Sequence, residues 1–154
     1  MSSQLIKWNP LPTERASDYV LTSISERSSL PHVDLRIILS HISDDTKKID
    51  IYFKYSAFAN KMTPREQDTE TIPSLHREWG DAFDPEHIFF KRSDSPFLQW
   101  MNYQFYNAGV ERIINFSFIT SDAVIDVAAY EEIEIRLIKD SQVIDSEIIC
   151  YQVL

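Results

Sequence analysis

Glycine is almost absent from this chain of 154 residues, which contains only Gly80 and Gly109. A loop that wraps a phosphate or a dinucleotide needs several glycines close together, because only glycine lets the main chain approach the ligand so closely. Two isolated glycines therefore exclude both a P-loop and a dinucleotide-binding fingerprint. Most turns must depend instead on Asp, Asn, Ser and Pro, which also favour turn conformations.

Cysteine occurs once, at Cys150, which excludes an internal disulfide and any zinc site built on several cysteines. The chain also has no run of 18 apolar residues that would span a membrane. Its first residues show no basic segment followed by an apolar one, as a secretory signal would. We therefore expect a cytoplasmic protein without a membrane span, and nothing in the sequence calls for a cofactor.

Basic residues are in the minority, because 15 Lys and Arg oppose 24 Asp and Glu and give a formal net charge of −9. Such a surface repels nucleic acid and anionic membranes and attracts a basic protein. The commoner explanation of an acidic composition is solubility alone. The charge thus predicts no nucleic-acid or membrane binding, and it makes a basic protein the expected kind of partner.

The most regular pattern lies in the last third of the chain, residues 111–154. Ile133, Ile135 and Leu137 alternate there with charged residues, so a strand would have one apolar face and one charged face. The same alternation predicts two strands at 33–42 and 47–55, joined by a polar turn into a hairpin. Other strands are predicted at 18–25, 86–91, 113–119, 132–138 and 142–153, and 123–128 fits either a short strand or one helical turn.

Two parts of the chain depart from this strand pattern. Residues 96–108 are predicted to form a helix, because Ser95 can cap its start and Gly109 can follow its end, although the many aromatic residues also fit a strand. Residues 56–86 lose all periodicity and are predicted to be an irregular loop insertion, in which 72–83 carry apolar residues at helical spacing.

Together these patterns predict a single globular domain, 1–154, of the β-rich α+β class. The expected architecture is a mainly antiparallel sandwich or curled sheet with one or two short helices. The N-terminal residues 4–16 are expected to form a short edge segment and an extended connection, because Pro10 and Pro12 do not fit inside a central strand. The strand that ends near Leu154 is expected at a sheet edge, where it offers an alternative role in homodimer formation.

The densest group of polar residues lies between His76 and His87. Four of its members are the weak candidates for metal ligands, namely His76, Glu78, Asp81 and His87. Their spacing matches neither a zinc-deaminase signature, which needs two further cysteines, nor an EF-hand loop. We therefore expect no metal site, and a solvated loop with surface ion pairs is the simpler interpretation.

No catalytic motif is present, since the chain lacks a G-x-S-x-G elbow and its one cysteine lies in an apolar run. We therefore favour a binding protein over an enzyme, one that acts stoichiometrically on another protein as an inhibitor, an immunity-like protein or an assembly factor. Aromatic residues with polar tips and nearby carboxylates are typical of such interfaces, although an aromatic-rich helix is also typical of a buried core. The residues expected to contact the partner are Trp79, Asp81, Asp84, Trp100, Tyr103 and Tyr106.

The alternative function is a small-molecule binder or hydrolase. A curled sheet can enclose an apolar pocket, which Phe116, Phe118 and Tyr130 would line. His76 or His87, with neighbouring carboxylates, would then stand at its mouth.

Overall fold

The computed structural model describes residues 8–29, 32–105, 113–139 and 146–152. These residues form eight strands and two α-helices. In chain order the elements are β1 (Tyr19–Ser29), β2 (His32–His41), β3 (Lys48–Pro64), α1 (Thr71–Trp79), β4 (Phe89–Arg92), α2 (Pro96–Phe105), β5 (Ile114–Ile119), β6 (Ala123–Ala129), β7 (Glu132–Ile138) and β8 (Ser146–Gln152).

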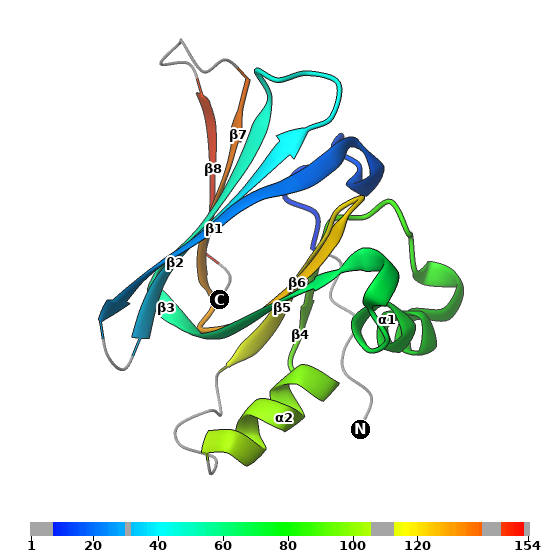
Figure 1. The fold of residues 1–154 in the computed structure, drawn as a ribbon, viewed down its shortest axis with the longest axis vertical. Helices are drawn as coiled ribbons and strands as arrows, with labels where there is room; N and C mark the ends of the chain where they lie inside the picture. Colours follow the sequence, from blue (N-terminus) through cyan, green and yellow to red (C-terminus); the bar gives the residue numbers. More distant parts are fainter. Residues whose placement is uncertain (1–7, 30–31, 106–112, 140–145, 153–154) are drawn as a thin grey trace.

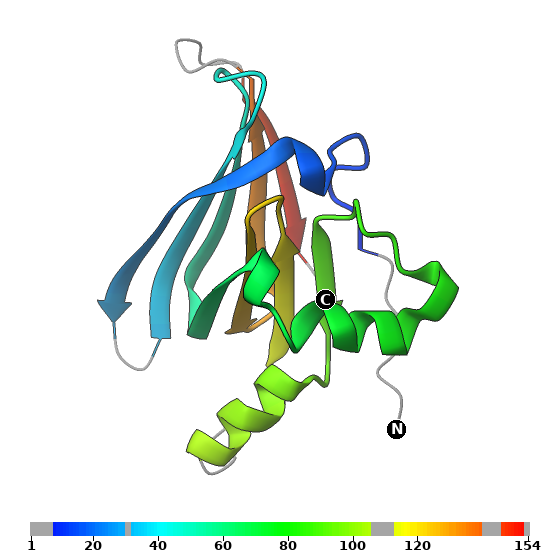
Figure 2. The same ribbon diagram turned by 45° about the vertical axis from the view of Figure 1, so that its right-hand side comes forward.

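The strand β3 belongs to both halves of a single curled antiparallel sheet (Figure 1, Figure 2). Its residues 48–52 lie between β2 and β7, whereas its residues 57–64 pair with β6. We call β1, β2, the first part of β3, β7 and β8 the first half-sheet. The second half-sheet consists of the last part of β3 with β6, β5 and β4. The predicted class, a β-rich α+β fold with a curled antiparallel sheet, is confirmed.

The bend between the two half-sheets is at Tyr55 and Ser56. Tyr55 has a φ of 51°, a left-handed conformation that costs a residue with a side chain about 1 kcal/mol or more. Ser56 accepts a hydrogen bond from the backbone N–H of Tyr130 at 3.0 Å, and its hydroxyl donates to the carbonyl oxygen of Glu132 at 3.1 Å. These two hydrogen bonds join the bend in β3 to the connection between β6 and β7. The chain therefore passes between the half-sheets at the same place in β3 and in the β6–β7 connection.

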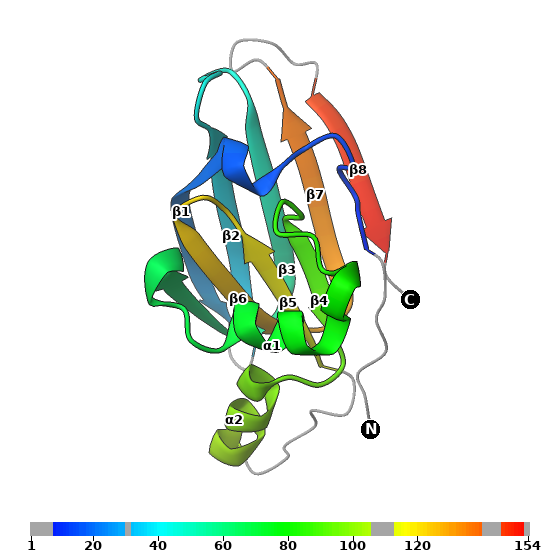
Figure 3. The same cartoon turned by 90° about the vertical axis from the view of Figure 1, so that its right-hand side faces the viewer.

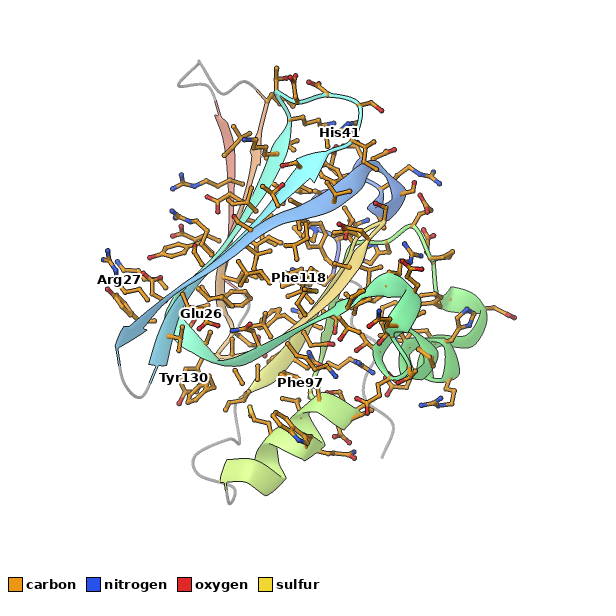
Figure 4. All side chains as sticks on the ribbon, viewed as in Figure 1. Glu26, Arg27, His41, Phe97, Phe118 and Tyr130 are labelled. Atoms are coloured by element: carbon orange, nitrogen blue, oxygen red, sulfur yellow. The ribbon has the colours of Figure 1, made fainter. Side chains whose placement is uncertain are left out.

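The main core fills the space between the half-sheets. Phe53 from the first half-sheet meets Phe116 of the second edge to face, with ring centroids 5.4 Å apart. Phe118 lies between the two halves in Figure 4, while Arg27 projects away from them. The alternating residues Ile133, Ile135 and Leu137 are all buried, as the alternation predicts.

The second half-sheet is covered on its outer face as well, by α1 (Figure 3). All residues of β6 are buried, and Asp126 lies beneath α1 with its carboxylate hydrogen-bonded to three side chains. The hydroxyl groups of Thr71 and Ser117 each donate to it at 2.6 Å, and the amide of Asn115 donates at 3.2 Å. A buried carboxylate is stable only with such donors, so this network fixes α1 on the sheet.

The helix α2 begins where its capping residue predicts. The hydroxyl of Ser95 accepts a hydrogen bond from the backbone N–H of Leu98 at 3.1 Å, which satisfies a free donor of the first turn. The predicted C-terminal signal, Gly109, lies outside the described residues. Phe97, Leu98 and Met101 form a small second core with β6, so the helical alternative is correct for this segment and the strand alternative is wrong.

The prediction of an irregular stretch at 56–86 is wrong for its first part, because residues 57–64 continue β3. Two features hide that strand in the sequence. A register shift between Ala57 and Ala59 interrupts the alternation, and residues 58–64 are all half-buried or exposed, so apolar and polar positions show no regular contrast. The helical spacing within 72–83 is confirmed by α1, in which Leu75 and Trp79 are buried.

A buried carboxylate fastens the N-terminal segment to the sheet. Glu14 accepts hydrogen bonds from the hydroxyl of Tyr19 at 2.5 Å and from the ammonium of Lys47 at 2.7 Å. Burial raises the pKa of Glu14, but these bonds and one from Thr13 outweigh it and leave the pKa below its ordinary value. Residues 8–16 form no strand, but the connection is not extended throughout, because the backbone N–H of Glu14 donates to the carbonyl oxygen of Leu11 at 3.1 Å and closes a turn. Residues 4–7, where we expect an edge segment, lie outside the described residues.

Replacing Asp126 by alanine should lower the free energy of unfolding by about 3 kcal/mol, because the Asp126→Ala change leaves the buried hydroxyl groups of Thr71 and Ser117 without an acceptor and leaves the Asn115 amide only the carbonyl oxygen of Phe116. Urea denaturation monitored by circular dichroism measures the change. The matched control is Asp45→Ala, at an exposed position of the turn between β2 and β3, where the expected effect is below about 0.5 kcal/mol. Equal effects of the two substitutions would contradict a structural role for the network.

The lowered pKa of Glu14 predicts how stability changes with pH. A carboxylate with a lowered pKa stabilises the fold above its unfolded pKa, ordinarily 4.5, and this stabilisation disappears as the pH falls through the folded value. Glu14→Gln should therefore be less stable than the wild type at pH 7, with a difference that shrinks below about pH 4. Unfolding free energies measured between pH 3 and 7, at about one-unit steps, test this; a difference that is independent of pH would contradict it.

Candidate functional site

A pocket of about 270 Å³ lies where the N-terminal segment passes the end of α1 and the start of β4. We call it the aromatic pocket. It is lined by Trp8, Asn9, Trp79, Ala82, Asp84, His87 and Phe90.

The local sequence explains why the chain returns to this place after α1. Gly80 has a φ of 53°, a conformation that glycine adopts without strain, and its backbone N–H donates to the carbonyl oxygen of His76 to end the helix. Asp84 then makes a turn, since its carboxylate accepts a hydrogen bond from the backbone N–H of Glu86 at 2.9 Å. This turn leads directly into His87 and β4.

Two hydrogen bonds hold the N-terminal segment against that turn. The ring of His87 bonds through Nε2 to the carbonyl oxygen of Trp8 at 2.8 Å, and the backbone N–H of Ala16 donates to the carbonyl oxygen of Glu86 at 2.8 Å. A carbonyl oxygen only accepts, so Nε2 of His87 carries a proton and is already used as a donor.

Aromatic rings form the walls of the pocket. Trp79 meets Phe90 edge to face with ring centroids 5.5 Å apart, and the ring of His87 contacts Phe90 at 4.9 Å. Trp8 packs edge to face on Phe89 and Phe116, at 5.7 and 5.4 Å. The pocket is therefore continuous with the main core, which supports its walls from behind.

The two tryptophans of the pocket each carry an unsatisfied donor. Trp8 and Trp79 are 6% and 9% exposed, and the indole nitrogen of each is buried without a hydrogen-bond partner. A buried N–H group without an acceptor costs about 1–3 kcal/mol. Both residues belong to the walls of the pocket, and both indole nitrogens are shielded from solvent.

The charges around the aromatic pocket are of both signs, since the ammonium group of Lys91 lies over the ring of Trp8, 5.7 Å from its centroid. Glu78 is paired with Arg92 at 3.4 Å, and Glu86 is paired with Arg15 at 3.1 Å. Within the described residues Asp84 forms no such ion pair, and its carboxylate accepts a hydrogen bond from the backbone N–H of Glu86. Asp84 is exposed, as is Asp81 in the single 3₁₀ turn Gly80–Ala82. Negative charge at the rim therefore remains open to a cation from outside.

Three residues singled out in the sequence meet at this pocket, namely Trp79, Asp84 and His87. Asp81 does not line the pocket, but it is next in sequence to Ala82, which does. Trp100 is elsewhere, 55% exposed on α2, where it stacks on Phe97. The side chain of Tyr103 and the whole of Tyr106 lie outside the described residues.

Sequence reasoning missed Trp8, Asn9, Ala82 and Phe90 as parts of the pocket. A tryptophan followed by two prolines indicates only an extended segment, and nothing local shows that this segment crosses β4. Phe90 belongs to a predicted strand, in which an aromatic residue is ordinarily part of the core. The hydrogen bond between His87 and Trp8 spans 79 positions of the chain, a separation that no short pattern reveals.

The four weak metal candidates do not converge. His76 packs its ring on Phe83 at 4.6 Å, Glu78 reaches Arg92, and His87 bonds a backbone carbonyl. Within the described residues, no group of three or more His, Cys, Asp or Glu side chains is placed to hold a metal ion.

The apolar pocket of the small-molecule alternative is filled by side chains. Phe116 and Phe118 are fully buried against Trp8 and Phe53. Tyr130 instead meets Phe58 edge to face at 4.9 Å, outside the main core. None of the three predicted lining residues borders the aromatic pocket.

Two further hollows are less suited to bind a ligand than the aromatic pocket. One, of about 390 Å³, lies on the outer face of the first half-sheet, where Arg36 already pairs with Asp50 and covers the ring of Tyr52. The other, of about 410 Å³, lies beside α2, where Lys61 pairs with Glu70 at 3.5 Å. In each hollow one basic side chain is therefore already paired within the protein.

No protein-family model, curated protein or solved structure matches this chain. In the part of the chain that the structure describes, no helix has the length and apolar character needed to cross a membrane.

The exposure of the three tryptophans predicts which of them a quencher reaches. Trp100→Phe should remove most of the fluorescence that acrylamide quenches, because Trp100 is 55% exposed while Trp8 and Trp79 are 6% and 9% exposed. Trp79→Phe, the matched control, should leave the quenchable fraction nearly unchanged. Stern–Volmer titrations of the three proteins give the comparison, and an unchanged slope in Trp100→Phe would show that the pocket tryptophans are accessible.

Proposed function

We propose that this protein is a non-enzymatic, stoichiometric binding protein for a basic protein partner in the cytoplasm, and that the aromatic pocket is its contact surface. Such a protein acts by occupying its partner, as an inhibitor, an immunity-like protein or an assembly factor does. The supporting observation is a pocket walled by Trp8, Trp79 and Phe90 that has the exposed carboxylate of Asp84 at its rim and the exposed Asp81 close by in the chain.

Each part of the pocket suits a segment of another protein. The flat rings of Trp8, Trp79 and Phe90 present apolar contact area of the kind found at the centre of interfaces. A Lys or Arg side chain from the partner meets Asp84 and Asp81 at the rim. The overall charge of −9 favours rapid encounter with such a partner.

A hydrolase is less well supported by the same geometry. His87 and Asp84 both line the pocket, but Nε2 of His87 is bonded to the Trp8 carbonyl and the Asp84 carboxylate accepts from the turn. Neither group is poised on a nucleophile. A small-molecule binder is the second candidate, and the volume of the pocket is the one observation that favours it. At about 270 Å³ this volume is just below the usual range for ligand sites.

A second copy of the chain is a separate candidate partner. In the described residues β8 pairs only with β7, and a strand with a free edge pairs readily with another strand. Sedimentation equilibrium distinguishes this proposal from the first, because a homodimer through β8 forms without any basic partner.

The proposed function is tested by selecting binders from a phage-displayed library of random dodecapeptides. We expect enrichment in Lys and Arg, and association rates that fall as salt rises, because steering between exposed charges is screened. The paired variant Asp81→Asn with Asp84→Asn should weaken the selected peptides by about tenfold, or about 1.4 kcal/mol. Surface plasmon resonance measures both quantities.

The matched control removes two negative charges elsewhere, through Asp45→Asn with Glu66→Gln, both at exposed positions. The control variant has the same net charge as the test variant. An equal loss of peptide affinity in both would mean that overall charge causes the loss, which would contradict the proposed surface. Selection of peptides without basic residues would contradict the proposed partner.

A further inference from the structure

We propose that residues 60–63 of β3, which we call the β3 edge, bind an extended segment of another protein as an added strand. One apolar side chain of that segment enters the hollow beside Trp100. This hollow shares no lining residue with the aromatic pocket, so binding here is independent of the proposed function. Two observations carry the proposal, namely the pairing pattern of β3 and the apolar side chains exposed beside it.

The last part of β3 has a neighbouring strand on one side only. Its pairing with β2 stops at Ala57, opposite Val33, whereas residues 57–64 pair with β6 on the other side. Among the described strands, none pairs with 58–64 from the side away from β6. A strand edge of this kind presents backbone N–H and C=O groups, and an extended peptide binds to it through them.

A backbone hydrogen bond at the end of β3 shows which residues turn these groups towards β6. The N–H of Arg65 donates to the carbonyl oxygen of Asp122 at 3.0 Å, so these two opposed residues form a bonded pair. Bonded and unbonded pairs alternate along an antiparallel ladder. Counting back from Arg65 by twos, Thr63 and Lys61 also direct their backbone groups to β6.

Asn60 and Met62 therefore turn their backbone groups to the open side of β3. A second bond gives the same alternation, because the N–H of Thr120 donates to the carbonyl oxygen of Ala123 at 2.9 Å. This bond directs the odd-numbered residues of β6 to β5 and the even-numbered ones to β3. The side-chain amide of Asn60 donates to Glu26, which uses neither backbone group. Each of the two open residues thus offers one donor and one acceptor to an added strand.

Apolar side chains are exposed beside these groups. Met62 is 49% exposed, although it is a large apolar residue. The hollow of about 410 Å³ is walled by Phe97 and Trp100, whose rings stack 6.1 Å apart, and it reaches Asn60 on β3. The ammonium of Lys61 lies 6.0 Å from the centre of the Phe97 ring, so α2 lies next to the β3 edge (Figure 1). Alternate side chains of an added strand share one face, which lets one of them enter this hollow.

The occupant is a different protein, because two copies of the β3 edge pair poorly with each other. In a two-fold antiparallel pair, open residues of one copy lie opposite open residues of the other. A pairing centred on Lys61 places two ammonium groups opposite each other. Centres nearer Pro64 set that proline, which has no N–H, against a residue with free backbone groups. Centres nearer Ala57 meet the register shift of β3 between Ala57 and Ala59. A segment of another protein has none of these defects.

Amide hydrogen exchange of the ¹⁵N-labelled protein tests whether the edge is open. We expect the amides of Asn60 and Met62 to exchange at least about tenfold faster than those of Lys61 and Thr63, which are bonded to β6. Equal protection of all four amides would overturn the proposal, because the edge would then already be covered.

The occupant is tested by selecting phage-displayed random heptapeptides on the wild type after depletion on Met62→Pro. Proline removes the free N–H at position 62 and leaves the bonds to β6 in place. We expect peptides with β-branched residues around one Leu, Phe or Trp. Surface plasmon resonance should show about tenfold weaker binding to Met62→Pro, and the peptides should protect the amides of Asn60 and Met62. Enrichment of no peptide would overturn the proposal.

The matched control is Met62→Ala, which removes the same side chain and keeps the N–H, so it should bind the peptides within about twofold of the wild type. Trp100→Ala should weaken them by about tenfold, because the hollow loses a wall. Thermal unfolding verifies that each variant is folded. Equal losses in Met62→Ala and Met62→Pro would show that the backbone takes no part, which overturns strand addition.

A second measurement needs no change in the protein. Methylation of the backbone nitrogens of a selected peptide keeps its side chains and removes its donors, so the affinity for the wild type should fall by about tenfold. An unchanged affinity would contradict strand addition. Sedimentation equilibrium of the free protein examines the other occupant, since a dimer that Met62→Pro abolishes would show a second copy at this edge and overturn the choice of another protein.

Discussion

The structure depends on one strand that serves two half-sheets. Because β3 pairs with β2 and β7 through its first part and with β6 through its last, the two halves cannot separate without breaking a continuous chain of backbone hydrogen bonds. The left-handed Tyr55 and the two hydrogen bonds of Ser56 set the position of the bend. The position of the bend makes the apolar sides of the two half-sheets face each other and brings their aromatic side chains together in the core. It also sets the direction of the outer face on which α1 packs.

The two faces of the second half-sheet are held by different forces. On the inner face, rings from both half-sheets and from the N-terminal segment exclude water, and burial of apolar area stabilises the contact. On the outer face, Asp126 organises the hydroxyl and amide donors below α1. Arg92 extends this network, since it donates to the hydroxyl of Ser74 at 2.8 Å. Hydrogen bonds of this kind add geometric specificity, so α1 ends at a defined place and presents Trp79 to the pocket.

Periodicity predicted the strands of the first half-sheet because each of them has one covered face and one solvated face. The hairpin of β2 and β3 and the alternation in β7 are examples. The same signal is weak in the second half-sheet, where β6 is buried on both sides and its segment fitted a strand or a helical turn equally well. The pairing of β3 with both β6 and β7 joins residues far apart in the chain, and no local pattern encodes it.

The candidate site was predictable only in part, for the same reason. Trp79, Asp84 and His87 belong to one stretch of the chain, and their unusual composition marks that stretch as a place for function. Trp8 joins them only in the folded chain, through the bond between its carbonyl and His87. Its own neighbours in the sequence indicate an extended connection and nothing more. Long-range contacts of this kind are where sequence reasoning fails while local composition still succeeds.

The position of Trp8 in the pocket has a consequence for how ligand binding and folding are linked. One wall of the site is the N-terminal segment, in which Trp8, Leu11 and Ala16 are buried in the main core, whereas the other walls belong to α1 and β4. The segment is also bonded to Lys47 through Glu14 and to His87 through the carbonyl oxygen of Trp8. A ligand that contacts both walls binds only when this segment is in place, so its binding stabilises the attachment of the segment by mass action. Occupancy of the pocket and attachment of the N-terminal segment are thus two measures of one equilibrium.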